Sequence, residues 1–226
     1  MLPFFTPVNL KSISGCFPDI NIYPIRNIFL KHIYTIGEKM TYQNSPQITD
    51  RQKQILYGTI LGGSSIIMPV KGKNCYLAMR DKNKEWLKYK VDFLSNLFKM
   101  DDNTIKKDVT TYRAYSVAYT IFNDMHDIFY KKSVKTINRE ILDTLTDQAW
   151  MVWFVDGGRK EKNKCYLKTQ KFGEQGSKIV VDYFTSLECD CELRKFRGRS
   201  EIAFSENGSN EFMKVISSCL PPFIVL

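Results

Sequence analysis

Basic, aromatic and amide side chains alternate with apolar ones in one short stretch of the chain. Its polar members are Lys164, Tyr166, Lys168 and Gln170. Because alternate residues of a β-strand share a face, this order predicts a strand with one polar face and one apolar face. Lysines can bind phosphate oxygens, and an amide such as Gln170 can read base edges. The row therefore predicts binding of nucleic acid, and a solvated sheet face without a ligand is the alternative.

Further basic side chains lie on neighbouring predicted strands and turns. The candidates for contact with nucleic acid are Lys71, Lys73, Arg80, Arg113, Arg159, Lys160, Lys164, Tyr166, Lys168, Gln170, Arg194, Arg197 and Arg199. The last three surround Gly198, where we expect a hairpin tip suited to phosphate contact; a basic loop that only keeps the chain soluble is the alternative. The formal net charge of +9 at pH 7 agrees with a polyanionic partner.

The cysteines and histidines argue against a zinc site. The six cysteines form no Cys-x-x-Cys pair, and the chain has only two histidines. A catalytic triad built on histidine is poorly supported for the same reason, and we expect reduced, partly buried thiols in an intracellular protein. No uninterrupted apolar run reaches the length of a membrane span, so we expect no membrane partner.

Two similar stretches organise the elements that must position these side chains. Residues 56–65 read LYGTILGGSS, and residues 149–160 read AWMVWFVDGGRK. Each is an apolar stretch with a glycine pair at its end, followed by a predicted basic strand. Thr49 opens a capping box before the first stretch, and Thr146 gives a helix-start signal before the second. The order predicts two motif helices, each at the start of a repeat.

This pair of motifs resembles the LAGLIDADG homing endonucleases of the two-motif, single-chain type. The resemblance covers about residues 48–222. It implies an α/β (α+β) fold, namely a pseudo-twofold duplicated αββαββα domain with a basic antiparallel sheet saddle. It also implies that the two motif helices pack side by side. In that packing we expect Gly58 and Gly62 to face Val152, Trp153 and Asp156.

The resemblance and the breaks in pattern divide the chain into four parts. We expect an N-terminal extension at 1–47, a first repeat at 48–131, a linker at 132–144 and a second repeat at 145–226. Prolines at 3, 7, 18 and 24 break any long helix before residue 25, and a short helix is predicted for 25–40. We interpret the extension as an ordered arm that wraps the domain or a partner, with a transit peptide as the alternative.

Within the repeats, the expected order is helix, two strands, helix, two strands and helix. In the first repeat we expect helices at 49–62, 84–98 and 121–130, with strands inside 65–79 and 110–119. In the second we expect helices at 146–155, 177–187 and 210–220, with strands inside 159–172 and 192–204.

The sequence departs from the resemblance at the residues that carry the family's chemistry. In active members, the acid before the final glycine of each motif holds a divalent metal between the scissile phosphates. The aligned residues here are Gly63 and Gly157, and Asp156 aligns one place earlier. Magnesium prefers oxygen ligands, and two metals can stabilise the attacking and leaving oxygens. We therefore expect no catalytic residue and no metal site, with Asp156 as the sole candidate for residual, one-sided activity.

We interpret the chain as a catalytically degenerate, nuclease-derived protein that binds nucleic acid without a cofactor, RNA being favoured over duplex DNA. A maturase-like role or membership of a ribonucleoprotein, such as an organellar ribosome, suits this interpretation. The alternative is an active intron-encoded homing endonuclease that cuts double-stranded DNA with magnesium. The chain is rich in residues with A/T-rich codons, which indicates a mitochondrial or other organellar origin.

Overall fold

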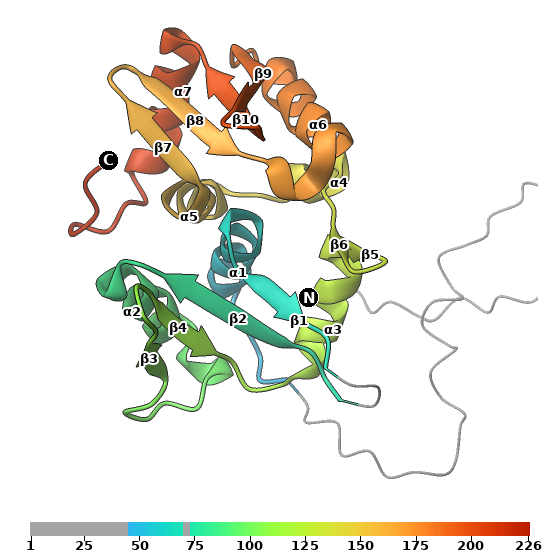
Figure 1. Cartoon of the computed structure of the whole chain (residues 1–226), viewed down its shortest axis with the longest axis vertical. Coiled ribbons are helices and arrows are strands. Elements are labelled where there is room, and N and C mark those ends of the chain that lie inside the picture. Colours follow the sequence, from blue (N-terminus) through green and yellow to red (C-terminus); the bar gives the residue numbers. More distant parts are fainter. Residues whose placement is uncertain (1–44, 70–72) are drawn as a thin grey trace, which may run out of the picture. The chain divides into compact units, whose positions relative to one another are not determined.

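Two similar series of helices and strands follow one another along the chain (Figure 1). The computed structural model describes residues 45–69 and 73–226. The predicted extension up to residue 44, its helix at 25–40 and the candidate Lys71 lie outside the described residues. The described residues belong to one compact unit.

The first series starts with the first motif helix. It comprises α1 (Asp50–Gly62), β1 (Ser65–Ile67), β2 (Tyr76–Asp81), α2 (Lys84–Phe93), the 3₁₀ helix η1 (Ser95–Leu97), β3 (Ile105–Lys107), β4 (Tyr112–Tyr115) and α3 (Thr120–Phe129). A small hairpin and a short helix then connect the two series. They are β5 (Tyr130–Lys131), β6 (Val134–Lys135) and α4 (Arg139–Asp143).

The second series repeats this order. It comprises α5 (Asp147–Gly157), β7 (Gly158–Glu161), β8 (Lys164–Lys168), the 3₁₀ helix η2 (Gln170–Phe172), α6 (Gly173–Ser186), β9 (Cys191–Phe196), β10 (Arg199–Phe204) and α7 (Glu206–Ser217). Each series builds a four-stranded antiparallel sheet, in the orders β1-β2-β4-β3 and β7-β8-β10-β9. The duplicated α/β arrangement with antiparallel sheets is therefore confirmed.

Local signals in the sequence fix the start of α1. Thr49 accepts a hydrogen bond from the backbone N–H of Gln52, and the Gln52 side chain accepts one from the backbone of Thr49. This reciprocal capping box satisfies two helix-terminal donors that have no partner within the helix. Thr146 precedes α5, where its backbone N–H donates to the Gln54 side chain of α1 at 2.9 Å. The two helix starts are thereby tied together.

The two motif helices pack against each other through their small residues. A Cβ atom placed on Gly58 would lie 2.4 Å from the carbonyl oxygen of Ala149 and 2.7 Å from Cβ of Val152. A Cβ atom on Gly62 would lie 2.4 Å from Cβ of Asp156. Only glycine permits this approach. The expected contacts with Val152 and Asp156 are confirmed, whereas Trp153 lies next to Gly157 instead.

Several predicted boundaries are wrong for identifiable reasons. The helix expected at 84–98 ends at Phe93, because Leu94 leaves helical geometry and η1 follows. The strand pair expected inside 110–119 is β3 with β4, joined by a turn in which the backbones of Asp108 and Thr111 hydrogen-bond to each other. The helix expected at 177–187 already begins at Gly173, and the linker contains a hairpin and α4. Among the described residues, no helix has both the length and the apolar character of a membrane span.

Candidate nucleic-acid interface

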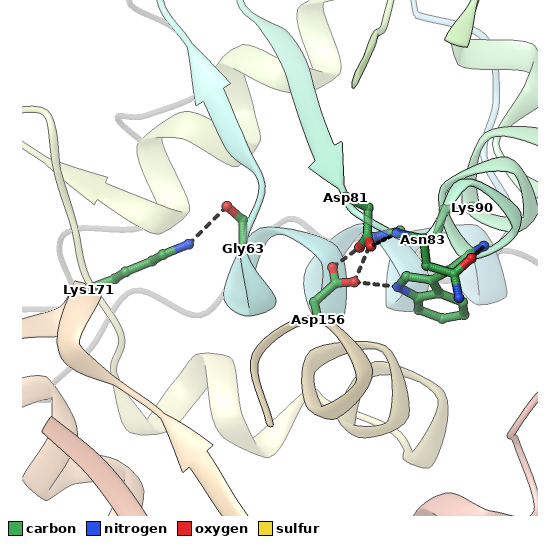
Figure 2. Close-up of polar contacts among 7 residues, drawn as sticks. Gly63, Asp81, Asn83, Lys90, Asp156 and Lys171 are labelled. Carbon is green, nitrogen blue, oxygen red and sulfur yellow. Dashed lines mark hydrogen bonds and ion pairs between the residues drawn. The ribbon is translucent and has the colours of Figure 1, made fainter. Parts of the chain in front are cut away.

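Asp156, at the end of α5, is buried and fully engaged. Its carboxylate accepts hydrogen bonds from Lys90 Nζ at 2.7 and 2.9 Å and from Trp86 Nε1 at 2.5 Å. The side chains of Lys90 and Asp156 are only 1% and 5% exposed. Figure 2 shows this group next to Asp81, whose pKa is raised by burial and by the charge of Asp156. Asp156 thus anchors α5 to α2 of the first repeat, and its charge is paired with that of Lys90.

Two lysines hold the end of α1. Lys171 Nζ donates to the carbonyl oxygen of Gly63 at 2.9 Å (Figure 2), and Lys135 Nζ donates to the carbonyls of Ile60 and Ser64, both at 2.6 Å. The C-terminal end of a helix carries a partial negative charge, which these ammonium groups neutralise. Burial, together with the nearby charge of Lys171, lowers the pKa of Lys135 to about 7. Desolvation also lowers the pKa of Lys171, and Asp156 acts in the opposite direction.

These residues do not fit the magnesium pair that active relatives of this type would need. Gly63 and Gly157 have no side-chain oxygen, the Gly63 carbonyl accepts from Lys171, and the Asp156 carboxylate is paired with Lys90 and accepts from Trp86. Among the residues that the structure describes, no group of three or more His, Cys, Asp and Glu side chains is placed to hold a metal. Cations that belong to the chain itself stand at both motif ends.

The second sheet carries most of the predicted contacts on one face. The registers place Arg159 opposite Tyr166 and Lys168 opposite Glu201, which in turn lies opposite Arg194. Side chains directly opposite each other in an antiparallel pair lie on the same face. The residues of this face, which we call the second-sheet face, are Arg159, Glu161, Lys164, Tyr166, Lys168, Glu192, Arg194, Phe196, Arg199, Glu201 and Ala203.

Part of the positive charge on this face is compensated internally. Glu201, whose side chain is 4% exposed, accepts from Arg159 at 2.8 Å and from Arg194 at 2.7 Å. The two guanidinium groups lie 3.9 and 4.0 Å from the ring centroid of Tyr166. Arg159 also pairs with Glu161. Arg159, Arg194 and Tyr166 therefore form a fixed cluster, which we call the arginine–tyrosine cluster.

Lys164 and Lys168 differ from this cluster because both are exposed. Within residues 45–69 and 73–226, neither lysine forms an ion pair. Gln170 does not continue their row, because β8 ends at Lys168 and Gln170 begins η2. The prediction that Gln170 lies on this strand is therefore wrong. The backbone leaves the extended conformation at Thr169, with φ −126° and ψ 3°.

The remaining candidates take four kinds of position. Arg197 and Gly198 form the tip of the β9–β10 hairpin, with φ of 50° and 74°, as the glycine predicts. Lys160 lies opposite Cys165, on the other face of the second sheet. Arg80 and Arg113 lie opposite each other on the first sheet, and both are near Asp108, at 3.1 and 3.8 Å. Lys73 is exposed ahead of β2.

A comparison with family models decides the identity of the fold. The model of the LAGLIDADG DNA endonuclease family matches residues 53–212. The chain belongs to the LAGLIDADG DNA endonuclease family. Solved structures of homing endonucleases share the fold. One is the homing endonuclease I-WcaI bound to its DNA recognition sequence, with a TM-score of 0.71, 21% identity, and coverage of 78% of this chain and 85% of that chain.

A second similar structure is I-DmoI in complex with DNA and manganese, with a TM-score of 0.53, 13% identity, and coverage of 75% of this chain and 97% of that chain. At these identities the structures show the shared fold. A search of curated proteins gave no match.

Sequence reasoning about this LAGLIDADG chain missed the residues that neutralise its motif ends. Lys90 carries a detectable signal, because it follows Trp86 by one helical turn and so lies on the buried face of α2. Lys135 and Lys171 carry no such signal, since their carbonyl partners are 71 to 108 positions away. The acid that fixes the arginine–tyrosine cluster, Glu201, was also missed.

Proposed function

We propose that this protein binds nucleic acid, RNA in preference to duplex DNA, and does not cut it. The observation that carries the proposal is that lysines of the chain occupy the surroundings of both motif ends. Lys90 neutralises Asp156, and Lys171 holds the Gly63 carbonyl. A divalent ion at these places would meet an ammonium group, and the Asp156 carboxylate is already paired with Lys90, so metal-dependent cleavage lacks the anionic ligands it needs at the motif ends.

Binding is supported by the charge of the second-sheet face. Lys164 and Lys168 are exposed on that face at the two ends of β8, with Tyr166 between them. Arg199 and Arg197 continue the positive charge toward the hairpin tip. Such side chains bind phosphate groups without reading sequence. I-WcaI and I-DmoI, which share the fold, have been seen with DNA. A polyanion is therefore the ligand that suits this surface.

The preference for RNA is the part of the proposal that goes beyond the family. The double loss of the family's acids removes the reason to retain recognition of a DNA cutting site. We therefore extend the proposal to a maturase-like factor or a subunit of a ribonucleoprotein, such as an organellar ribosome, in a mitochondrion or other organelle. An active endonuclease that cuts duplex DNA with magnesium remains the competing function.

The test is a pair of measurements on the full chain. Fluorescence anisotropy would compare binding of a structured RNA and of duplex DNA over a range of salt concentrations, and a plasmid assay would follow cutting in magnesium. We expect tighter binding of RNA, a steep fall in affinity with salt, and no strand cleavage. Magnesium-dependent cutting by the unmodified protein would contradict the proposal, as would the absence of binding to either nucleic acid.

A matched pair of variants locates the surface. Changing Lys164 and Lys168 together to Ala should weaken binding and lower the slope of log affinity against log salt by about 1.4–1.8, since each phosphate contact contributes ~0.7–0.9. Lys160→Ala is the control, because Lys160 lies on the opposite face of the same sheet. An equal loss in the control variant would assign binding to another surface.

A further inference from the structure

A small hollow opens on the second-sheet face, outside the motif ends. Its volume is about 200 Å³, and it is lined by Lys164, Tyr166, Asp190, Cys191, Glu192, Arg194, Ala203, Phe204 and Ser205. The hollow is smaller than the ~300–1,000 Å³ of a site for a drug-sized ligand. Its size suits a single planar ring system.

A difference between the two repeats explains the hollow. Ser65 and Arg159 occupy equivalent positions in the two repeats, since each lies two residues after the aligned motif glycine. Ser65 lies opposite Ala78, and Arg159 lies opposite Tyr166, so Ala78 and Tyr166 are also equivalent. On the next strand, Ala78 faces Tyr115, whereas Tyr166 faces Ala203. The tyrosine thus lies on the fourth strand of the first repeat, β4, but on the second strand of the second repeat, β8, and the alanine takes the other position in each. Tyr115 thus stands in the first sheet where Ala203 stands in the second, and the missing ring leaves space beside Glu192.

The lining of the hollow combines hydrogen-bond acceptors with positive charge. Glu192 lies directly opposite Ala203 in the register, and the described part of the chain offers this exposed carboxylate no ion pair. Lys164 and Arg194 line the same hollow. The guanidinium of Arg194 is held by Glu201 and by the Tyr166 ring, so its planar group has a fixed position. A ligand that suits this lining is planar, carries a hydrogen-bond donor and is attached to a phosphate.

We propose that the hollow receives one unpaired base of an RNA strand, with an exocyclic amino group of the base directed at Glu192. This inference rests on the proposed function and names the kind of RNA that the site recognises. Carboxylates accept hydrogen bonds from the N4 amino group of cytosine, whereas uracil presents a carbonyl at that position. Arg194 provides a surface on which the base can stack, and Lys164 binds the adjoining phosphate. The base must be unpaired, because a base that is paired and stacked in a helix cannot enter the hollow.

The experiment uses the full chain and two labelled single-stranded RNAs of equal length, oligocytidine and oligouridine. Oligodeoxycytidine of the same length and a duplex DNA are the further ligands. In the unmodified protein we expect oligocytidine to bind roughly tenfold more tightly than oligouridine. Ala203→Tyr places in the hollow the residue that the first sheet carries there. It should abolish this preference and leave the salt-dependent affinity for duplex DNA unchanged.

Glu192→Gln keeps the size of the side chain and should reduce the preference, because the amide can donate to uracil as well as accept from cytosine. Glu161→Gln is the control, since Glu161 is on the same face but does not line the hollow. Thermal unfolding of each variant verifies that it is folded.

Three outcomes would overturn the proposal. Equal binding of oligocytidine and oligouridine by a protein that still binds RNA would remove the base site and leave the proposed function intact. A preference that persists in Ala203→Tyr would place the recognition elsewhere. Equal affinity for oligodeoxycytidine would show that the hollow accepts single-stranded DNA and would contradict the assignment to RNA. A chain that binds none of these ligands would instead contradict the proposed function itself.

Discussion

The ends of the two motif helices carry the same sequence change but have different surroundings. At the end of α1, Gly63 is exposed, and an added Cβ atom would meet nothing closer than Lys171 Nζ at 3.8 Å. At the end of α5, Gly157 is buried, and an added Cβ atom would lie 2.9 Å from the carbonyl oxygen of Gly62. One end is therefore open and positively charged, and the other is closed and neutralised.

This difference shows that a glycine at the motif end has distinct surroundings, and so distinct consequences, in the two repeats. The carboxylate of Asp156 is retained at the closed end, where it serves packing between the repeats through Lys90 and Trp86. At the open end, the buried Lys135 donates to the last carbonyls of the helix, and the exposed Lys171 places a positive charge at the helix terminus near the surface. The closed end supports the fold, whereas the open end can face a polyanion.

The largest expected effect comes from breaking the closed end. Lys90→Met would leave the buried Asp156 carboxylate without its counter-charge, and removal of one partner of a buried pair costs about 3–5 kcal/mol. Chemical denaturation should show a loss of that size in the free energy of unfolding. Lys88→Met is the control, because the Lys88–Asp92 pair is exposed and such pairs contribute only ~0.2–1 kcal/mol. Equal losses in the two variants would show that Asp156 does not depend on Lys90.

The helix interface before these ends should show the next largest effect. Gly58→Ala would push a methyl group against the Ala149 carbonyl, which is backbone and cannot move aside alone. We expect a loss of about 1–3 kcal/mol by overpacking. Gly63→Ala, whose added Cβ atom meets only the end of a lysine side chain, should change stability much less. Equal free energies of unfolding for the two variants would contradict the close packing of Gly58 against Ala149.

Lys135 at the open end should make the free energy of unfolding depend on pH. The Lys135 pKa is lowered to about 7 in the folded chain, against ~10.4 for a free lysine. Above pH 7 the folded lysine releases its proton while the unfolded lysine keeps it, so the unfolded state binds more protons and stability rises with pH. Between pH 7 and pH 8.5 this gain should reach about 1–2 kcal/mol.

Lys135→Met should be less stable at every pH because two carbonyls lose their donor, and its stability should lack this rise. Lys131→Met, on the same hairpin but exposed, should keep the rise. The measurement is denaturant unfolding at several pH values. If the free energy of unfolding rose equally with pH in the unmodified protein and in Lys135→Met, the pH dependence would belong to another group.

The comparison of the two ends also shows how far the sequence alone reaches. The motif stretches predict both helices, their order and the contact of Gly58 with Val152, because these features depend on local periodicity and on the size of glycine. The neutralisation of the ends could not be predicted, since Lys135 and Lys171 bind carbonyls distant in sequence. The basic strands were found, but the compensation of Arg159 by Glu201 depends on a cross-strand register that no local pattern gives.

The smallest expected effect concerns restoration of the family's acid at the open end. Gly63→Asp has space for its side chain, and Gly63 has an extended φ of −172° that any residue can adopt. The new carboxylate would lie beside Lys171, so we expect a change in unfolding free energy within about 0.5 kcal/mol, as for an exposed pair. We also expect no gain of plasmid cutting in magnesium, because Lys171 would neutralise the acid.

Gly157→Asp should cost more stability, since its Cβ atom would crowd the Gly62 carbonyl. Cutting by Gly63→Asp alone would show that Lys171 yields its place to a metal, and the contrast between an open and a closed end would then lose its chemical meaning.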